Sequence, residues 1–342
     1  MQKHSFLLLG TYADEAPYHP IDPVEDIFRE IFNDIGELKV TDKVGELKDL
    51  SQYDGVISFL DVWDRSPVDA EAEMLVKYVE NGGALLVLHN GICISQNESL
   101  KSLTGGSFVS HPEQEILKYT PLKHEITEGI APFSLKEEPY RFDFADSART
   151  LLLNYSYRGE EYPAAWCREV GDGRVVYLSP GHTAEQFKEP EYRKLIRNSL
   201  LWCLKAQKSC GIVPFTVKDN EIYYLLIKQT NDVVCFPKGH VEEGETEKET
   251  ALRECMEETN IKAEILDGFR DEMVYYMPEY DKYKQVIHFV GKIDSFDYRK
   301  QDEEISSMML CTYDEALEMF RYQNLKDLLV KADAFLAYLF SV

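Results

Sequence analysis

The chain has 342 residues, of which 44% are hydrophobic, and its formal net charge is -24. This length suits two domains with separate cores, and the acidic balance argues against binding to a nucleic-acid backbone or an anionic membrane surface. Its seven cysteines include no Cys-x-x-Cys pair, which favours reduced thiols over a disulfide framework. The first apolar run is too short for a signal peptide and no segment is long enough to span a bilayer, so we expect a cytoplasmic protein.

The first half of the chain alternates short apolar runs with helical patterns. Buried strands are expected at residues 6–10, 55–60, 84–88, 150–153, 164–170 and 174–179. Helices are expected at residues 22–35, 73–79 and 191–204. This alternation predicts an α/β fold whose parallel sheet is covered by helices on both faces.

Polar residues follow several of these strands, and ligands of parallel sheets collect at the carboxyl ends of strands. His89 comes directly after the strand at 84–88, and His182 follows the strand at 174–179. With His111 and Glu138 they form a candidate pocket for a small molecule or a transition metal. The alternative is that each histidine caps a strand end and hydrogen-bonds to the backbone.

Several short motifs along this half occur together in one known family. They are the strand-Leu-His89 turn, Gly105-Gly106-x-Phe with His111, His124-x-Ile-Thr-x-Gly, Glu137-Glu138-x-Tyr140 and strand-Gly-His182. Residues 4–206 therefore resemble the trehalose-utilisation (ThuA-like) family of the class I glutamine-amidotransferase superfamily, which implies a flavodoxin-like sheet. The superfamily places its cysteine nucleophile in the turn that His89 occupies here, and Cys93 lies beyond that turn. Amidotransfer would need Cys93 with His182 as its base, and it stays open beside the pocket interpretation.

Residues 204–210 are short and polar, and we place the domain boundary there, with domains at 1–207 and 208–342. In the second domain we expect strands at residues 211–217, 222–227, 233–236, 267–276, 284–292 and 305–311. Helices are expected at residues 246–259, 314–320 and 325–339, the first two opened by capping boxes.

A glycine-containing loop at residues 239–244 leads into an acidic helix. Glu254, Glu257 and Glu258 on that helix are spaced to share one face. Three crowded carboxylates repel one another, and Mg2+ or Mn2+ would remove that cost. The alternative is an acidic helix whose charges face water.

The same segment resembles the Nudix box, Gly-x5-Glu-x7-Arg-Glu-U-x-Glu-Glu-x-Gly-U, where U is a bulky apolar residue. The matching residues are Gly239, Glu245, Arg253, Glu254, Glu257, Glu258 and Ile261. Cys255 fills the first U position, and Asn260 replaces the second glycine at the helix end, where asparagine is the next-best residue. The resemblance implies a mixed sheet between helices in an α/β/α sandwich, and Mg2+- or Mn2+-dependent hydrolysis of a nucleoside diphosphate linked to another group.

The resemblance also implies roles for individual residues. Glu254 and Glu258 would be the principal metal ligands, and Glu257 would share the metal or act through water. Arg253 would orient the glutamates during catalysis, while Gly239 and Glu245 would shape the loop. Glu303 or Glu304 is the candidate catalytic base, and a solvated turn is the equal alternative for that pair.

Residues 237–242 and 284–289 are similar to the corresponding segments of asymmetrical diadenosine tetraphosphate hydrolases. Lys238 and Lys284 would then neutralise phosphates, while Tyr276 and His288 would contact a base, although aromatic residues on strands are often core. We therefore predict a hydrolase of dinucleoside polyphosphates that cleaves diadenosine tetraphosphate to ATP and AMP. A nucleoside triphosphate, a nucleotide sugar and a diphosphoinositol phosphate stay open as substrates. A nucleotide-sensing regulator without turnover is the alternative function, and self-association into a homo-oligomer stays open.

Overall fold

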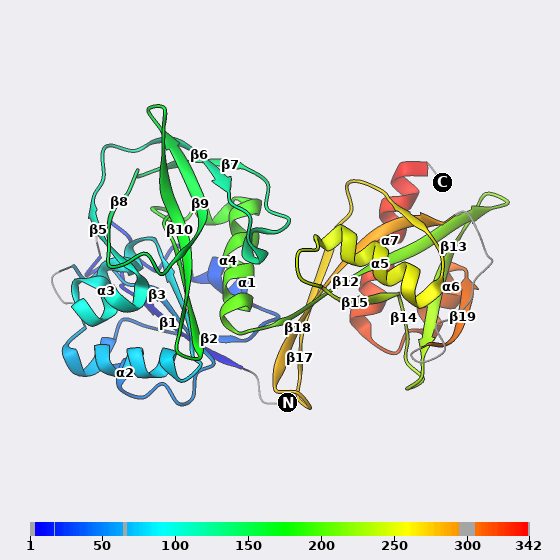
Figure 1. The fold of residues 1–342 in the computed structure, drawn as a ribbon, viewed down its shortest axis with the longest axis horizontal. Helices are drawn as coiled ribbons and strands as arrows, with labels where there is room; N and C mark the ends of the chain where they lie inside the picture. The colour runs from blue at the N-terminus through cyan, green and yellow to red at the C-terminus, as the bar shows by residue number, and fades with distance from the viewer. Residues whose placement is uncertain (1–3, 17, 64–66, 294–304, 341–342) are drawn as a thin grey trace. The chain divides into compact units, whose positions relative to one another are not determined.

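The computed structural model describes residues 4–16, 18–63, 67–293 and 305–340. It divides into two compact units, Met1–Ala206 and Gln207–Val342 (Figure 1). Within the described ranges, no helix is both long enough and apolar enough to cross a membrane. Each unit is an α/β structure with its own sheet, which confirms the predicted fold class.

The first unit is built on a nine-stranded sheet of order β2-β1-β3-β4-β11-β10-β9-β6-β7. Its parallel strands are β2 (Glu37–Thr41), β1 (Ser5–Gly10), β3 (Gly55–Phe59), β4 (Ala84–Leu88) and β11 (Gly173–Leu178). All five residues of β4 are buried, as expected for a strand covered on both faces. The antiparallel strands are β10 (Glu160–Val170), β9 (Thr150–Tyr157), β6 (Glu115–Pro121) and β7 (Phe133–Glu137).

Helices cover both faces of the parallel strands (Figure 1). One core joins alternate strand residues, such as Leu7 and Val87, to helices α2 (Asp69–Glu80) and α3 (Glu98–Thr104). On the other face, α4 (Pro190–Cys203) contacts β4 and β11, and α1 (Glu25–Ile31) contacts α4. A separate two-stranded sheet pairs β5 (Gly106–Ser110) with β8 (Arg141–Phe144). The predicted parallel sheet is therefore present, and four antiparallel strands extend it.

The second unit contains an eight-stranded mixed sheet of path β14-β13-β12-β18-β16, on which β15, β17 and β19 pair with β12, β18 and β13. The strands are β12 (Gln207–Lys218), β13 (Glu221–Gln229), β14 (Val234–Cys235), β15 (Lys238–His240), β16 (Ala263–Ile265), β17 (Asp271–Met277), β18 (Lys282–Ile293) and β19 (Ile305–Cys311). Only the β12–β18 pair is parallel among the described pairs. The sheet is therefore mixed, as predicted.

Three helices complete the second unit: α5 (Glu247–Thr259), α6 (Tyr313–Met319) and α7 (Gln323–Phe340). Ala251 and Cys255 of α5 are fully buried in the core that the sheet shares with α6 and α7. Leu252 and Met256, the larger apolar residues of α5, are 36% and 39% exposed. The core-facing side of α5 is therefore narrow and made of small residues, which lets the helix lie close to β12.

Candidate functional site

The loop and helix of the Nudix-like segment are fixed at both helix ends. At the start, the Thr246 hydroxyl accepts from the Glu249 amide at 3.3 Å, and the Glu249 carboxylate accepts from the Thr246 amide at 2.8 Å. This reciprocal capping box sets where the helix begins. At the other end, Asn260 adopts a left-handed φ of 55°, the conformation that the replaced glycine would supply.

Gly239 brings the loop backbone directly against α5. It lies on β15, which pairs with β12 through Cys210. A β-carbon at residue 239 would stand 2.0 Å from the carboxyl carbon of Glu254, so no other residue fits unless this carboxylate moves. The close approach places an acidic group beside the loop backbone, which is the geometry a shared cation site needs.

Arg253 connects the loop to the acidic face of the helix. Its Nε donates to Glu245 Oε1 at 2.6 Å, and its Nη2 donates to the His240 carbonyl at 2.9 Å. Its Nη1 donates to Glu254 Oε1 at 2.8 Å and to Glu257 Oε2 at 3.0 Å. The hydrogen bond from Arg253 is the main reason that the pKa of Glu245 falls to about 2. Arg253 therefore acts here as a positioning residue.

Glu258 completes the acidic group from one helical turn beyond Glu254. It is 3% exposed, and its Oε2 accepts a hydrogen bond from the Lys238 amide at 2.8 Å. A buried carboxylate needs compensating partners, and a divalent cation next to Glu254 and Glu257 would provide one. Glu254 and Glu258 lie against the loop 238–240, and Glu257 is joined to Glu254 through Arg253. Their carboxylates fit the oxygen-ligand preference of Mg2+ or Mn2+.

Lys284, a lysine next to this acidic group, has a lowered pKa. Lys284 on β18 is 6% exposed, and its Nζ lies 2.8 Å from His240 Nε2. Burial, followed by repulsion from Lys238, lowers the pKa of Lys284 to about 8. The structure therefore brings Lys238 and Lys284 together beside the glutamates, where phosphate groups need positive charge.

His288 shares the strand face of Lys284, four residues further along β18. It is 1% exposed, and neither of its ring nitrogens has a hydrogen-bond partner among the described residues. Burial, with a smaller effect from Lys238, lowers the pKa of His288 to about 3, so the ring is neutral. A buried imidazole with free polar atoms is rare and is available to a bound ligand or a water molecule.

The register of β17 and β18 separates the two tyrosines that precede these residues. Tyr275 pairs with Lys284, whereas Tyr276 pairs with Tyr283. Directly paired residues share a face of the sheet and successive residues alternate. Tyr275 therefore lies on the face of Lys284, and the predicted base contact Tyr276 lies on the opposite face. The candidate bases Glu303 and Glu304 lie outside the described residues.

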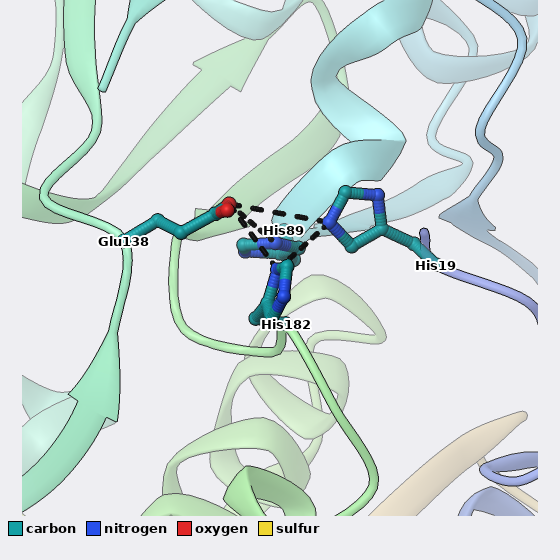
Figure 2. A group of neighbouring side chains, drawn as sticks. All are labelled: His19, His89, Glu138 and His182. Atoms are coloured by element: carbon teal, nitrogen blue, oxygen red, sulfur yellow. Dashed lines mark hydrogen bonds and ion pairs between the residues drawn. The ribbon is translucent and has the colours of Figure 1, made fainter. Parts of the chain in front are cut away.

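A second polar cluster lies in the first unit, at the carboxyl ends of its parallel strands (Figure 2). His89 follows β4, His182 follows the neighbouring strand β11, and Glu138 follows β7. His182 Nδ1 lies 3.3 Å and His89 Nε2 3.7 Å from Glu138 Oε2. The predicted convergence of His89, His182 and Glu138 is therefore seen in the structure.

His19 is the fourth member of this cluster, and the sequence reasoning missed it. Its Nε2 lies 3.0 Å from His182 Nδ1 and 4.0 Å from Glu138 Oε2. The available signal was its position after the first strand, whose carboxyl end lies at the same sheet edge. His111 lies on the rim instead: its side chain is 38% exposed, and its Nε2 is 3.7 Å from the other carboxylate oxygen, Glu138 Oε1.

His89 and His182 differ in their environments although their rings are neighbours. Burial, then the nearby His19, keeps the pKa of His89 well below its ordinary value. Burial also acts to lower the pKa of His182, but the neighbouring Glu138 carboxylate outweighs it and raises that pKa overall. His89 also has a positive φ of 43°, a conformation rare outside glycine and typical of functional turns.

Cys93 does not have the environment of a nucleophile. It is fully buried, its Sγ donates to the Leu60 carbonyl at 3.4 Å, and burial raises its pKa to about 12. A reactive cysteine needs the opposite shift, toward the thiolate. The structure therefore favours the pocket interpretation over amidotransfer by Cys93.

The mixed sheet, the glycine loop and the arginine-organised glutamates define the second unit as a Nudix-type phosphoanhydride hydrolase. Family models agree with both units: the NUDIX domain model matches residues 205–331, and the trehalose utilisation (ThuA) model matches residues 13–203. The chain belongs to the ThuA family through its first unit and to the NUDIX family through its second.

Individual relatives resemble one unit each. The bis(5'-nucleosyl)-tetraphosphatase [asymmetrical] of Sus scrofa is 32% identical over an alignment of 143 positions, which covers 38% of this chain and 96% of the relative. A Caenorhabditis elegans Ap4A hydrolase, solved as a binary complex, is 28% identical over 39% of this chain and 98% of its own, with a TM-score of 0.37. A ThuA-like protein from Bacteroides uniformis is 20% identical over 59% of this chain and 91% of its own, with a TM-score of 0.47.

Proposed function

We propose that the second unit hydrolyses dinucleoside polyphosphates, cleaving diadenosine tetraphosphate to ATP and AMP with Mg2+ or Mn2+ bound at the loop and helix. The observation that carries the proposal is that two kinds of side chain lie beside one loop: glutamates that would hold the metal and a lysine that would bind phosphate. Glu254 and Glu258 lie against the loop 238–240, and Arg253 links Glu254 to Glu257. The buried Lys284 lies beside the same loop through His240. The similarity to tetraphosphatases over nearly their whole length supports this substrate class.

The metal would be held by Glu254 and Glu258, with Glu257 binding directly or through water. When bound, a divalent cation neutralises phosphate oxygens and lowers the pKa of a coordinated water. Arg253 holds Glu254 and Glu257 in place through its Nη1. Most of the catalysis by the chain itself would then be positioning and charge neutralisation, as is general for phosphoryl transfer.

Lys238, Lys284 and His288 would bind the parts of the substrate that lie away from the cleaved bond. Lys284, while protonated, supplies a positive charge from a site with little water, where a charge-assisted bond to phosphate is strong. His288 is neutral, and neither ring nitrogen has a hydrogen-bond partner among the described residues, so it can donate to one polar group and accept from another. Tyr275, on the same face, would replace Tyr276 as the aromatic contact.

Product analysis on the purified full chain tests this function. The panel with Mg2+ would contain diadenosine tetraphosphate, ATP, dNTPs, a nucleotide sugar and a diphosphoinositol phosphate. We expect the first to give ATP and AMP, and labelled water to mark the product whose phosphorus is attacked. Preference for another member would correct the substrate class. Tight binding of a nucleotide without turnover would favour the sensor function.

A further inference from the structure

We propose that His19, His89, Glu138 and His182 in the first unit bind a transition metal ion of the zinc class. One ligand atom from each residue lies within 4.8 Å of the others, and the side chains point toward a common centre (Figure 2). Ligands at about 2.0–2.1 Å from a tetrahedral zinc stand about 3.3 Å apart. Four of the six separations are 3.0, 3.3, 3.7 and 4.0 Å, which bracket that spacing, and the other two are within 4.8 Å.

The hydrogen bonds around the cluster leave lone pairs facing its centre. His89 Nδ1 lies 2.6 Å from the Ser179 carbonyl, which can only accept, so the proton is on Nδ1 and the Nε2 lone pair faces inward. His19 has the same arrangement, with Nδ1 3.2 Å from Asp61 Oδ2 and Nε2 facing inward. Each outer partner therefore selects the tautomer that a metal ligand requires.

Glu138 adds a negative charge to these inward lone pairs. Its Oε2 is buried and has no hydrogen-bond partner of good geometry among the described residues, although His182 Nδ1 lies 3.3 Å away. A proton on His182 Nδ1 can serve either Glu138 Oε2 or His19 Nε2, and it cannot serve both well. A cation at the centre would interact with all four atoms at once. The buried Glu138 oxygen therefore points to a bound cation independently of the spacing of the ligand atoms.

The surrounding chain holds these ligands in place. Glu137, next to Glu138, accepts from the amides of Gly181 at 2.7 Å and His182 at 3.1 Å. This ties the loop after β11 to the end of β7, so two ligands from distant parts of the sequence keep a fixed separation. Such supporting hydrogen bonds are typical of metal sites, and their loss usually lowers metal affinity by about 10–100-fold.

The nature of the ligands separates this site from the oxygen-only group of the second unit. Three imidazoles and one carboxylate suit zinc, iron, manganese, cobalt or nickel, whereas Mg2+ prefers oxygen ligands. The Tyr140 hydroxyl lies 3.2 Å from His89 Nε2, so it donates to this lone pair while no metal is bound, and a metal would take its place. The half-exposed His111 ring stacks near Tyr140. These groups would orient an oxygen-bearing small molecule beside the metal.

Cobalt binding by the full-length chain tests the proposal. The chain is stripped with a chelator, excess Mg2+ is added to fill the oxygen-ligand site, and Co2+ is titrated while visible d–d absorption is followed. We expect one Co2+ per chain with the strong absorption of a nitrogen-rich site, displaced by Zn2+. Absence of this absorption at stoichiometric Co2+ would overturn the proposal.

Matched variants then assign the ligands. Glu138→Gln keeps the shape and removes the charge, and it should weaken Co2+ binding by about tenfold or more. Glu115→Gln should leave the stoichiometry unchanged, because Glu115 is an exposed carboxylate on β6 of the same unit and lies outside the four-residue set. Equal Co2+ affinity in Glu138→Gln and the unaltered chain would show that the cluster is only a histidine–carboxylate ion-pair network.

A folding control keeps this result interpretable. Circular dichroism and Tm are measured for each chain in chelator, and Zn2+ should then raise the Tm of the unaltered chain and of Glu115→Gln but not of Glu138→Gln. If Glu138→Gln fails to fold, His182→Gln takes its place, since His182 is the more exposed ligand. An equal Zn2+-dependent rise of Tm in a folded ligand variant would count against the assignment.

Discussion

The carboxylate of Glu254 occupies the space beside Gly239 where any other residue would carry its β-carbon. The two carboxylate oxygens lie 2.1 Å from that position, well inside contact distance. The loop backbone and the proposed metal ligand therefore approach each other only because residue 239 is glycine.

Gly239→Ala should consequently reduce nucleotide hydrolysis by roughly 10^2-fold, because Glu254 must leave its position to admit the methyl group and metal-centred stabilisation is lost. The loss should appear in kcat and in the Mg2+ concentration needed for half-maximal rate, with circular dichroism unchanged. Gly45→Ala is the matched control, since a β-carbon there meets nothing within 4 Å. Near-normal rates in Gly239→Ala would show that Glu254 is not needed where it lies.

Glu258→Gln tests the buried ligand on the other side of the loop. The amide oxygen of glutamine can still accept from the Lys238 amide, so the contact at 2.8 Å survives while the negative charge is lost. We expect turnover to fall by roughly 10^2-fold or more. Glu264→Gln, an exposed change on β16, should leave the rate unaltered, and a retained rate in Glu258→Gln would remove Glu258 from the metal site.

Residues whose roles depend on local spacing were predictable from the sequence. The capping box at Thr246 and the left-handed Asn260 follow from short-range backbone chemistry, and both occur in the structure. His89 and His182 were also predictable as neighbours, because a parallel sheet places the carboxyl ends of its strands at one edge.

Features that depend on long-range pairing were not predictable in the same way. His19 lies in an irregular segment after β1, and only the folded loop brings its Nε2 to 3.0 Å from His182. The face of Tyr276 depends on the register between β17 and β18, and a shift of one residue would reverse it. The antiparallel extension from β10 to β7 contains half-exposed strands such as β6, whose apolar signal is weak.

The reactivity of the thiols tests, without any metal, whether Cys93 in the first unit is a nucleophile. All seven cysteines are buried, and burial raises the pKa of Cys93 to about 12. Since the thiolate is the reactive species, Ellman's reagent should modify the native chain only slowly and should titrate all seven thiols after unfolding in guanidinium. Cys93→Ala is the control that identifies Cys93. One thiol that reacts rapidly in the native chain and is missing in Cys93→Ala would restore a nucleophilic role for this residue.

Lys284 should give nucleotide hydrolysis a falling limb near pH 8. A depressed lysine pKa of about 8 means that the ammonium is present below this pH and is lost as the pH rises through it. The charge-assisted contact to phosphate disappears with the proton, so kcat/KM, which reports the free enzyme, should fall by about tenfold. Lys284→Arg should keep kcat/KM high to higher pH because a guanidinium stays protonated, and Lys284→Met should be low on both sides of pH 8. An unchanged falling limb in Lys284→Arg would assign the titration to another group.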